Sequence, residues 1–163
     1  YFSYLSGCEG SEVKIGDGRI LLESEQGSVM KEGYDVLAVD AFSDDAIPTH
    51  LLTVEAFEAY AERLRSLKSL LVIHLSNRYL NLAPLVFRVA AEIGFNAMLV
   101  QDGGGSSLGG TPSAWMVLSK DAAVFQSTIF ANTNSSFPDP IARAWTDDYS
   151  SLIPILDIPM PWN

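Results

Sequence analysis

Short apolar runs alternate with segments of helical period over much of the chain, and this alternation constrains the fold more than any other feature of the sequence. The runs are rich in branched residues and bounded by Gly, Asp or Ser, which is typical of buried strands. Strands that alternate with helices at this spacing pair in parallel through right-handed crossovers, with helices on both faces of the sheet. The sequence therefore predicts an α/β fold, with strands at residues 13–15, 36–39, 70–74, 97–100 and 115–118.

Two segments between these strands have the spacing of amphipathic helices. Apolar residues recur at i, i+3, i+4 and i+7 over residues 57–64, behind a candidate N-cap at Thr53. The second segment covers residues 82–93. Asn81 is at its expected N-cap, Pro84 is in its first turn and Gly94 is just past its end. These start and stop residues predict both helices and the limits of the second one.

After Gly94 the pattern changes. Two strands, at residues 96–100 and 113–119, are separated by the glycine-rich run 102–110 with no helical segment between them, which predicts a long antiparallel hairpin at one edge of the sheet. Prolines recur in the tail, which can hold only short helical turns. We therefore expect one domain over residues 1–163, with a lead-in at 1–12, a core at 13–119 and a helical, proline-rich tail at 120–163.

The charge and the cysteine content narrow the classes of function. A net charge of −10 opposes binding to nucleic acid, which depends on Lys and Arg, and favours a small cationic substrate. Cys8 is the only cysteine, as is typical of a reducing compartment, and no apolar run approaches the roughly 20 residues of a membrane-spanning helix. We expect a cytoplasmic protein. Because the chain begins at Tyr1 without a signal-peptide pattern, we also expect a fragment of a larger polypeptide.

Acidic residues follow two of the predicted strands. Asp40 comes directly after strand 36–39, and Asp44 lies on the loop beyond it. Asp17 follows strand 13–15 between two glycines, which allow a ligand to approach the backbone closely. In open α/β sheets the carboxyl ends of the strands form the ligand crevice, so we expect Asp40 to project into it. The structural alternatives are a turn cap at Asp40 and a helix N-cap at Asp17.

His74 ends the next strand, and we expect it to point toward the same crevice as Asp40. A single histidine at a strand end is more often a hydrogen-bonded structural residue than a base. With only His50 besides it, the chain has no histidine constellation for a metal. Ser76 lies outside a Gly-x-Ser-x-Gly turn, which disfavours serine hydrolase chemistry. The residues alone thus predict a polar cluster and leave its role open.

The order and spacing of several stretches resemble the spermidine synthases. These stretches are Ile-Gly-Asp-Gly-Arg at residues 15–19, Tyr-Asp-Val-Leu-Ala-Val-Asp-Ala-Phe at 34–42, Leu-Val-Ile-His at 71–74 and Thr-Pro-Ser at 111–113. The stretches Asp-Ala-Phe-Ser-Asp-Asp-Ala-Ile-Pro and His-Leu-Ser-Asn-Arg-Tyr, which begin at Asp40 and His74, are similar to bacterial spermidine-synthase-like proteins. Some proteins of that group are fused to membrane-transporter-like segments, which implies a membrane domain outside this chain as a possible partner.

The resemblance implies a Rossmann-like sheet of the methyltransferase type, of which this chain is the C-terminal part. Asp17 and Gly18 would hold the adenine of the co-substrate, decarboxylated S-adenosylmethionine or S-adenosylmethionine. Asp40 would be the base that accepts a proton from the attacking amine, because an amine must lose a proton before it attacks.

The resemblance also implies an amine-binding group formed by Asp44, His74 and Thr111. The loop after Asp40 and the threonine at 111 depart from the pattern of the synthases, so the choice of substrate stays open. Three readings follow: aminopropyl transfer to a diamine, methyl transfer from S-adenosylmethionine, and a non-catalytic binding domain on the same fold.

The first two strands of that fold are expected upstream of Tyr1. We therefore expect this chain alone to bind nucleosides poorly and to be inactive. Strands 13–15 and 36–39 would each also lose a neighbouring strand, and an unpaired apolar edge pairs readily with another chain. Either these two strands pair directly with each other, or the open edge is buried against a partner. The expected partner is a second copy in a homo-oligomer or an N-terminal fragment of the same protein.

Overall fold

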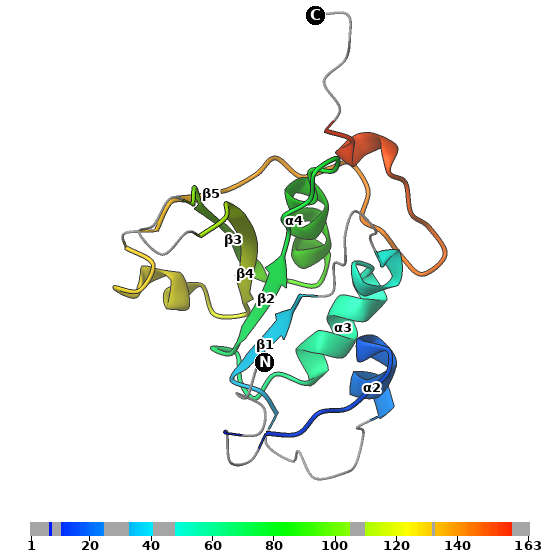
Figure 1. Cartoon of the computed structure of the whole chain (residues 1–163), viewed down its shortest axis with the longest axis vertical. Coiled ribbons are helices and arrows are strands. Elements are labelled where there is room, and N and C mark those ends of the chain that lie inside the picture. Colours follow the sequence, from blue (N-terminus) through cyan, green and yellow to red (C-terminus); the bar gives the residue numbers. More distant parts are fainter. Residues whose placement is uncertain are drawn as a thin grey trace, which may run out of the picture.

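The computed structural model describes residue 7 and residues 11–24, 33–40, 48–104, 110–131 and 133–157. At its centre lies a five-stranded sheet with the strand order β1-β2-β4-β3-β5 (Figure 1). The predicted α/β class is confirmed. The strands are β1 (Val36–Val39), β2 (Leu70–His74), β3 (Asn96–Asp102), β4 (Ser113–Ser119) and β5 (Ser135–Ser136). The helices are α2 (Gly18–Ser24), α3 (Val54–Glu62) and α4 (Ala83–Glu92), with 3-10 turns η1 (Thr49–Leu51), η2 (Ala122–Gln126) and η3 (Ile153–Ile155).

The sheet combines a parallel pair with an antiparallel hairpin. β1 and β2 are parallel, with Val39 opposite Ile73, as the alternation of strands and helices predicts. β3 and β4 form the predicted hairpin, but the hairpin is not a simple addition to one edge. β4 inserts between β2 and β3 and is antiparallel to both, and its buried residues Met116 and Leu118 continue the apolar face of β2. The short β5, which the sequence did not predict, pairs with β3.

The two long helices begin and end close to the predicted residues. The side chain of Thr53 caps α3 by accepting a hydrogen bond from the backbone N–H of Ala56 at 3.2 Å. α4 begins at Ala83, two residues after the predicted cap, and Asn81 Oδ1 still accepts from the N–H of Ala83 at 3.3 Å. Gly94 has a φ of +71° just past the end of α4, a left-handed conformation that favours glycine.

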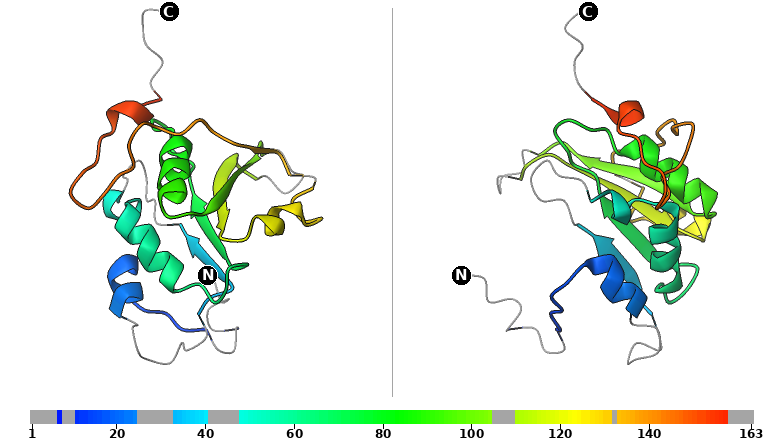
Figure 2. Two further views of the ribbon diagram at one scale, coloured as in Figure 1. Left: turned by 180° about the vertical axis from the view of Figure 1, so that it is seen from behind. Right: turned by 90° about the vertical axis from the view of Figure 1, so that its right-hand side faces the viewer.

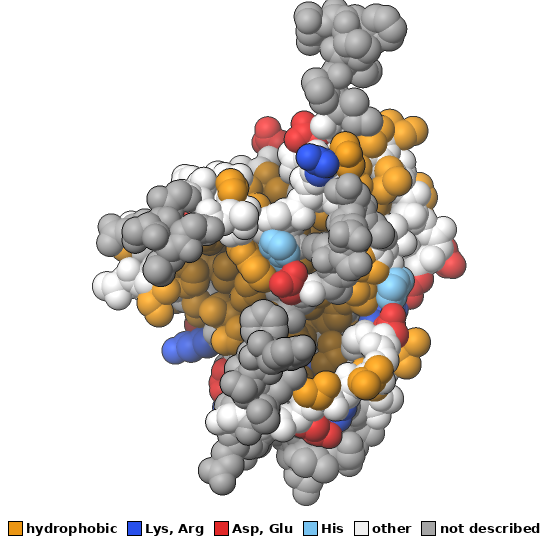
Figure 3. All heavy atoms as spheres, in the orientation of Figure 1, with side chains coloured by type: hydrophobic (Ala, Val, Ile, Leu, Met, Phe, Trp, Pro, Cys, Tyr) orange, Lys and Arg blue, Asp and Glu red, His pale blue; other side chains and the backbone are white. Residues whose placement is uncertain are grey.

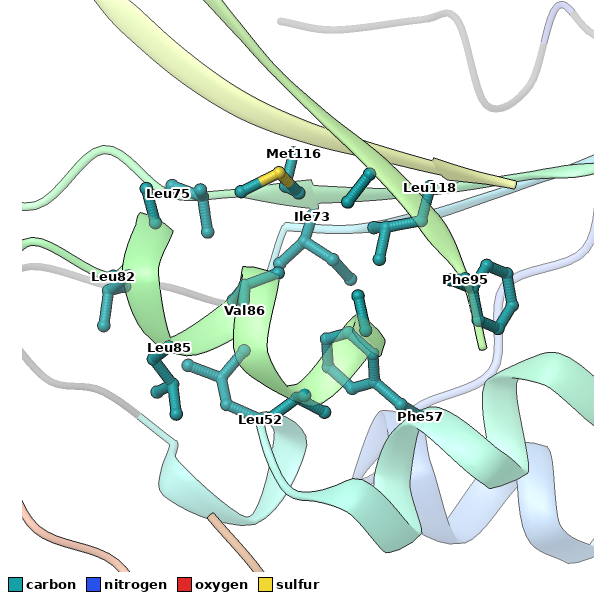
Figure 4. Close-up of a cluster of buried hydrophobic side chains, with 14 of the residues drawn as sticks. Leu52, Phe57, Ile73, Leu75, Leu82, Leu85, Val86, Phe95, Met116 and Leu118 are labelled. Atoms are coloured by element: carbon teal, nitrogen blue, oxygen red, sulfur yellow. The ribbon is translucent and has the colours of Figure 1, made fainter. Parts of the chain in front are cut away.

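Both α3 and α4 pack on the same face of the sheet. Their side chains Phe57, Leu85 and Val86 meet alternate residues of the central strands in one buried cluster (Figure 4). The strand side chains that share this cluster are Leu71, Ile73, Ala97, Leu99, Met116 and Leu118. The expectation that helices lie on both faces of the sheet is therefore wrong for the described helices. α2 lies outside this layer, against α3 (Figure 2).

The opposite face of the sheet remains partly exposed over β1 and β2. Val36 is 55% exposed, and Val72 and Trp115 on the same face are half-buried. Figure 3 shows hydrophobic side chains gathered in the middle of the face toward the viewer. β1 also ends the strand order, so its outer edge has no strand beside it within the described residues. No helix in the described part of the chain is long and apolar enough to cross a membrane.

The predicted strand at residues 13–15 is wrong. These residues have no regular structure, and the side chains of Val13 and Ile15 are 62% and 97% exposed. A strand is stable only where a neighbouring strand satisfies its backbone groups, and no described strand lies beside this segment. Apolar character and flanking glycines alone therefore did not identify a strand here.

Candidate functional site

Asp40 and His74 lie together at the carboxyl ends of β1 and β2. Asp40 directly follows β1, and His74 is the last residue of β2, so the parallel register brings the two side chains to the same edge and face of the sheet. The imidazole Nδ1 and Asp40 Oδ1 are 2.7 Å apart. The carboxylate of Asp40 is 56% exposed, whereas the His74 side chain is 22% exposed. The structure thus places these two predicted residues where the sequence led us to expect them.

Ser76 extends this pair into a chain of three hydrogen-bonded side chains. His74 Nε2 lies 2.8 Å from Ser76 Oγ, which also accepts a hydrogen bond from the backbone N–H of Ala114 at 2.9 Å. The ring of Trp115 stacks on the imidazole with 4.5 Å between centroids. An ionised carboxylate only accepts hydrogen bonds, so Nδ1–H donates to Asp40 when Asp40 is ionised; in a neutral imidazole Nε2 is then the acceptor, and the Ser76 hydroxyl donates to it. The contacts on both nitrogens therefore hold the ring in one tautomer and one orientation.

A polar hollow of about 440 Å³ opens beside Ser76, between the end of β3 and the start of β4. Gln101, Asp102, Asn77 and Asn134 line it together with Ser76, and none of its described lining residues is basic. The amide nitrogen of Asn77 is buried without a hydrogen-bond partner among the described residues, while its oxygen accepts from two backbone N–H groups. Buried polar atoms normally have such a partner, so this nitrogen is an exception among the described residues, as are Nε of Arg63 and Nε of Arg88.

Asp17 and Gly18 lie apart from the hydrogen-bonded side chains of Asp40, His74 and Ser76. Asp17 caps α2 by accepting a hydrogen bond from the backbone N–H of Ile20 at 3.0 Å, which is the structural alternative considered from the sequence. Its second oxygen lies 2.8 Å from Nε2 of His50. These two contacts hold the pKa of Asp17 below its usual value. An adenine amino group at Asp17 would have to share or replace these partners.

A neighbouring cluster joins α2 to the start of α3 and to the tail. Both nitrogens Nη1 and Nη2 of Arg19 donate to the carboxylate of Asp147, each at 2.7 Å, and Thr53 Oγ1 donates to the same carboxylate at 2.8 Å. The backbone carbonyl of Trp145, whose side chain is fully buried, accepts from the N–H of Val54. The guanidinium of Arg19 holds the pKa of Asp147 below its usual value. This cluster therefore connects α2, the start of α3 and the tail through hydrogen bonds.

Of the other two predicted site residues, the structure describes only Thr111, which is not part of either cluster. Asp44 lies outside the described residues. Thr111 is exposed at the end of the hairpin turn and precedes Pro112, which lines the polar hollow, but Thr111 itself does not line it. Within the described ranges, no three His, Cys, Asp or Glu side chains gather as a site for a metal ion.

Neither Ser76 nor Asp102 was predicted from the sequence as a residue of the candidate site. Ser76 lies two residues beyond His74, and the alternation of side chains along a strand places both on one face, which is a signal that could have identified it. Asp102 ends β3 just as Asp40 follows β1, and the same rule on strand ends applies to it. The glycine-rich run 102–110 that separates the two predicted strands includes Asp102, whereas β3 extends through that residue.

No protein-family model matches the chain, and no curated protein matches it.

Proposed function

We propose that this protein transfers an aminopropyl group from decarboxylated S-adenosylmethionine to a small amine, in the manner of the spermidine synthases that its sequence resembles. The observation that carries the proposal is the hydrogen-bonded pair of Asp40 and His74 at the carboxyl ends of two parallel strands. The parallel pair followed by an antiparallel hairpin also supports the methyltransferase type of sheet that the resemblance implies.

The chemistry requires a group that accommodates one proton. The neutral amine attacks the carbon next to the sulfonium, a C–N bond forms, and the C–S bond breaks with its electron pair left on sulfur. The new ammonium then gives a proton to the Asp40 carboxylate, which leaves a neutral amine and a protonated carboxyl group. The net charge of −10 favours the approach of a cationic amine. His74 keeps the carboxylate in place through its Nδ1–H.

The test uses the full-length protein, a diamine and decarboxylated S-adenosylmethionine, with methylthioadenosine and the alkylated amine measured by mass spectrometry. Asp40→Asn is expected to lower turnover by about 10² to 10⁴, the usual contribution of a positioned base. Asp35→Asn is the matched control, because Asp35 precedes the same strand and pairs with Arg65 at the surface. Circular dichroism checks that both variants are folded.

Equal and mild effects of the two substitutions would show that Asp40 is structural. Formation of S-adenosylhomocysteine from S-adenosylmethionine, with no product from the decarboxylated donor, would replace the proposal by methyl transfer. Absence of turnover with both donors would leave a binding domain without catalysis.

A further inference from the structure

Ser76, His74 and Asp40 have the mutual geometry of a serine nucleophile, its base and a carboxylate that orients the base. Ser76 Oγ lies 2.8 Å from His74 Nε2, and His74 Nδ1 lies 2.7 Å from Asp40 Oδ1. Both distances are within the reach of about 2.6–3.2 Å that a nucleophile and its base require. This arrangement recurs on unrelated folds and in different chain orders, so geometry identifies it. The Gly-x-Ser-x-Gly turn that Ser76 lacks belongs to only one of these folds.

The hydroxyl of Ser76 is held from two sides and still has a lone pair for a ligand. Its oxygen accepts from the backbone N–H of Ala114 at 2.9 Å, and its proton is directed at Nε2 when the imidazole of His74 is neutral. A hydroxyl oxygen has two lone pairs, so one remains for attack on a carbonyl carbon. Ser76 also lines the hollow of about 440 Å³, a volume within the range of small-molecule sites. A ligand in the hollow therefore meets the Asp40–His74 pair through Ser76.

The lining of the hollow determines which acyl compounds suit it. Gln101 and Asn134 line it, and the nitrogen of a carboxamide can donate a hydrogen bond to a carbonyl oxygen. Asp102 is also part of the lining, and none of the described lining residues is basic. A carboxylate in the hollow repels an anionic acyl group, and no lining cation offsets this repulsion. The lining therefore favours a small ester without negative charge.

We propose that Ser76 is the nucleophile of a second activity, the hydrolysis of small uncharged esters, with His74 as its base and Asp40 as the residue that orients His74. Ser76 Oγ bonds to the carbonyl carbon as its proton passes to His74 Nε2. The C–O bond to the alcohol then breaks, its electron pair stays on the alcohol oxygen, and that oxygen takes the proton from Nε2.

Water completes the reaction on the acyl-Ser76 ester. The water oxygen bonds to the carbonyl carbon as one of its protons passes to His74 Nε2, and the bond from that carbon to Ser76 Oγ breaks. Oγ keeps the electron pair and takes the proton from Nε2, so one ester and one water give one acid and one alcohol. Asp40 stays ionised throughout and stabilises the imidazolium that forms. The proposal does not depend on amine transfer, although both activities use Asp40 and His74.

Covalent labelling of the 163-residue chain with an alkyl fluorophosphonate tests the nucleophile. An activated serine oxygen bonds to phosphorus and displaces fluoride, and tandem mass spectrometry of the digested chain identifies the residue that carries the adduct. Labelling of Ser76 is expected to be at least about 10² times faster than that of Ser136, an exposed serine of β5 at the other end of the strand order from β1. His74→Gln is expected to slow the labelling of Ser76 at least about 10²-fold, because the base is lost.

Hydrolysis is measured with 4-nitrophenyl acetate as the ester. A burst of 4-nitrophenolate followed by slower turnover is expected, because an acyl-Ser76 intermediate accumulates. Ser76→Ala is expected to remove the burst and to lower kcat/KM at least about 10²-fold. Ser136→Ala is the matched control and should keep both the burst and the rate. Circular dichroism checks that the variants are folded.

Two results would overturn the proposal. The first is labelling of the wild-type chain that leaves Ser76 unmodified or modifies Ser136 as fast as Ser76. This result requires no variant, so it is decisive even where Ser76→Ala or His74→Gln does not fold. The second is hydrolysis of 4-nitrophenyl acetate by folded Ser76→Ala at the wild-type rate, which would assign the cleavage to other side chains.

Discussion

The Arg19–Asp147 pair joins residues 128 positions apart, and we predict that it contributes substantially to the stability of the fold. Two parallel hydrogen bonds of 2.7 Å connect the guanidinium to the carboxylate, and Thr53 donates a third bond to that carboxylate. Hydrogen bonds to charged groups contribute about 1.5–3 kcal/mol, whereas exposed ion pairs contribute about 0.2–1 kcal/mol. Since Arg19 is 13% exposed and Asp147 44% exposed, we expect a coupling free energy of about 1–2 kcal/mol between them.

A double-mutant cycle measures this coupling directly. The free energy of unfolding in urea is determined for the wild type, Arg19→Ala, Asp147→Ala and the double variant. Arg88 and Glu92 form the matched control, because this pair lies within one helix at i,i+4 and both side chains are more than a third exposed. Its coupling is expected to be about 0.3–0.5 kcal/mol. A coupling for Arg19 and Asp147 no larger than the control would refute the reasoning from burial and bidentate geometry.

The same coupling has a predicted dependence on pH. The hydrogen bonds from Arg19 lower the pKa of Asp147 in the folded state. A carboxyl with a lowered folded pKa contributes stability that is fully present above its unfolded value of about 3.9 and is lost as the pH falls through the folded pKa. The coupling should therefore be constant near neutral pH and decline in acid below about pH 4. A coupling that persists unchanged in strong acid would show that the charge of Asp147 is not its source.

The remaining predictions concern the core and the open edge of the sheet. Leu85→Ala is expected to lower the free energy of unfolding by about 2–5 kcal/mol, because Leu85 is fully buried in α4. Leu67→Ala, at a position that is 68% exposed, should change it by less than about 0.5 kcal/mol. Urea unfolding of the two variants measures both free energies. The chain is expected to form a two-fold dimer through β1, which light scattering detects, and Val36→Lys should dissociate it while Ile153→Lys on the tail should not. A monomer whose Val36–Val39 amides exchange slowly, with no further peptide bound in the mass spectrum, would contradict this.

The elements that the sequence predicted well are those whose signal is local. α4 carries its apolar period, an early proline and a terminal glycine within one short segment, so its limits were off by no more than two residues at its start. Asp40 and His74 could be placed together without a structure, because the carboxyl ends of neighbouring parallel strands meet at one edge. This placement required only that residues 36–39 and 70–74 be recognised as neighbouring parallel strands.

The features that the sequence did not reveal depend on which segments become neighbours. The contact of Ser76 with Ala114 exists because β4 inserts between β2 and β3, and no periodicity encodes that insertion. The bond between Arg19 and Asp147 likewise has no local signal. Residues 13–15 show the converse error, since a branched, glycine-flanked run is typical of a strand but forms one only where a partner strand is available.

The one-sided packing of the sheet connects assembly to the candidate site. Leu71 and Ile73 point into the helical layer, so their neighbours Val72 and His74 point to the opposite, partly exposed face. Asp40 shares that face, because its contact with His74 Nδ1 requires it. Any chain that covers the exposed apolar side chains of β1 and β2 would therefore also approach the Asp40–His74 pair and exclude water from it. Exclusion of water strengthens the electrostatic effect of such a pair, so disruption of the β1 contact by Val36→Lys should lower transfer activity together with assembly.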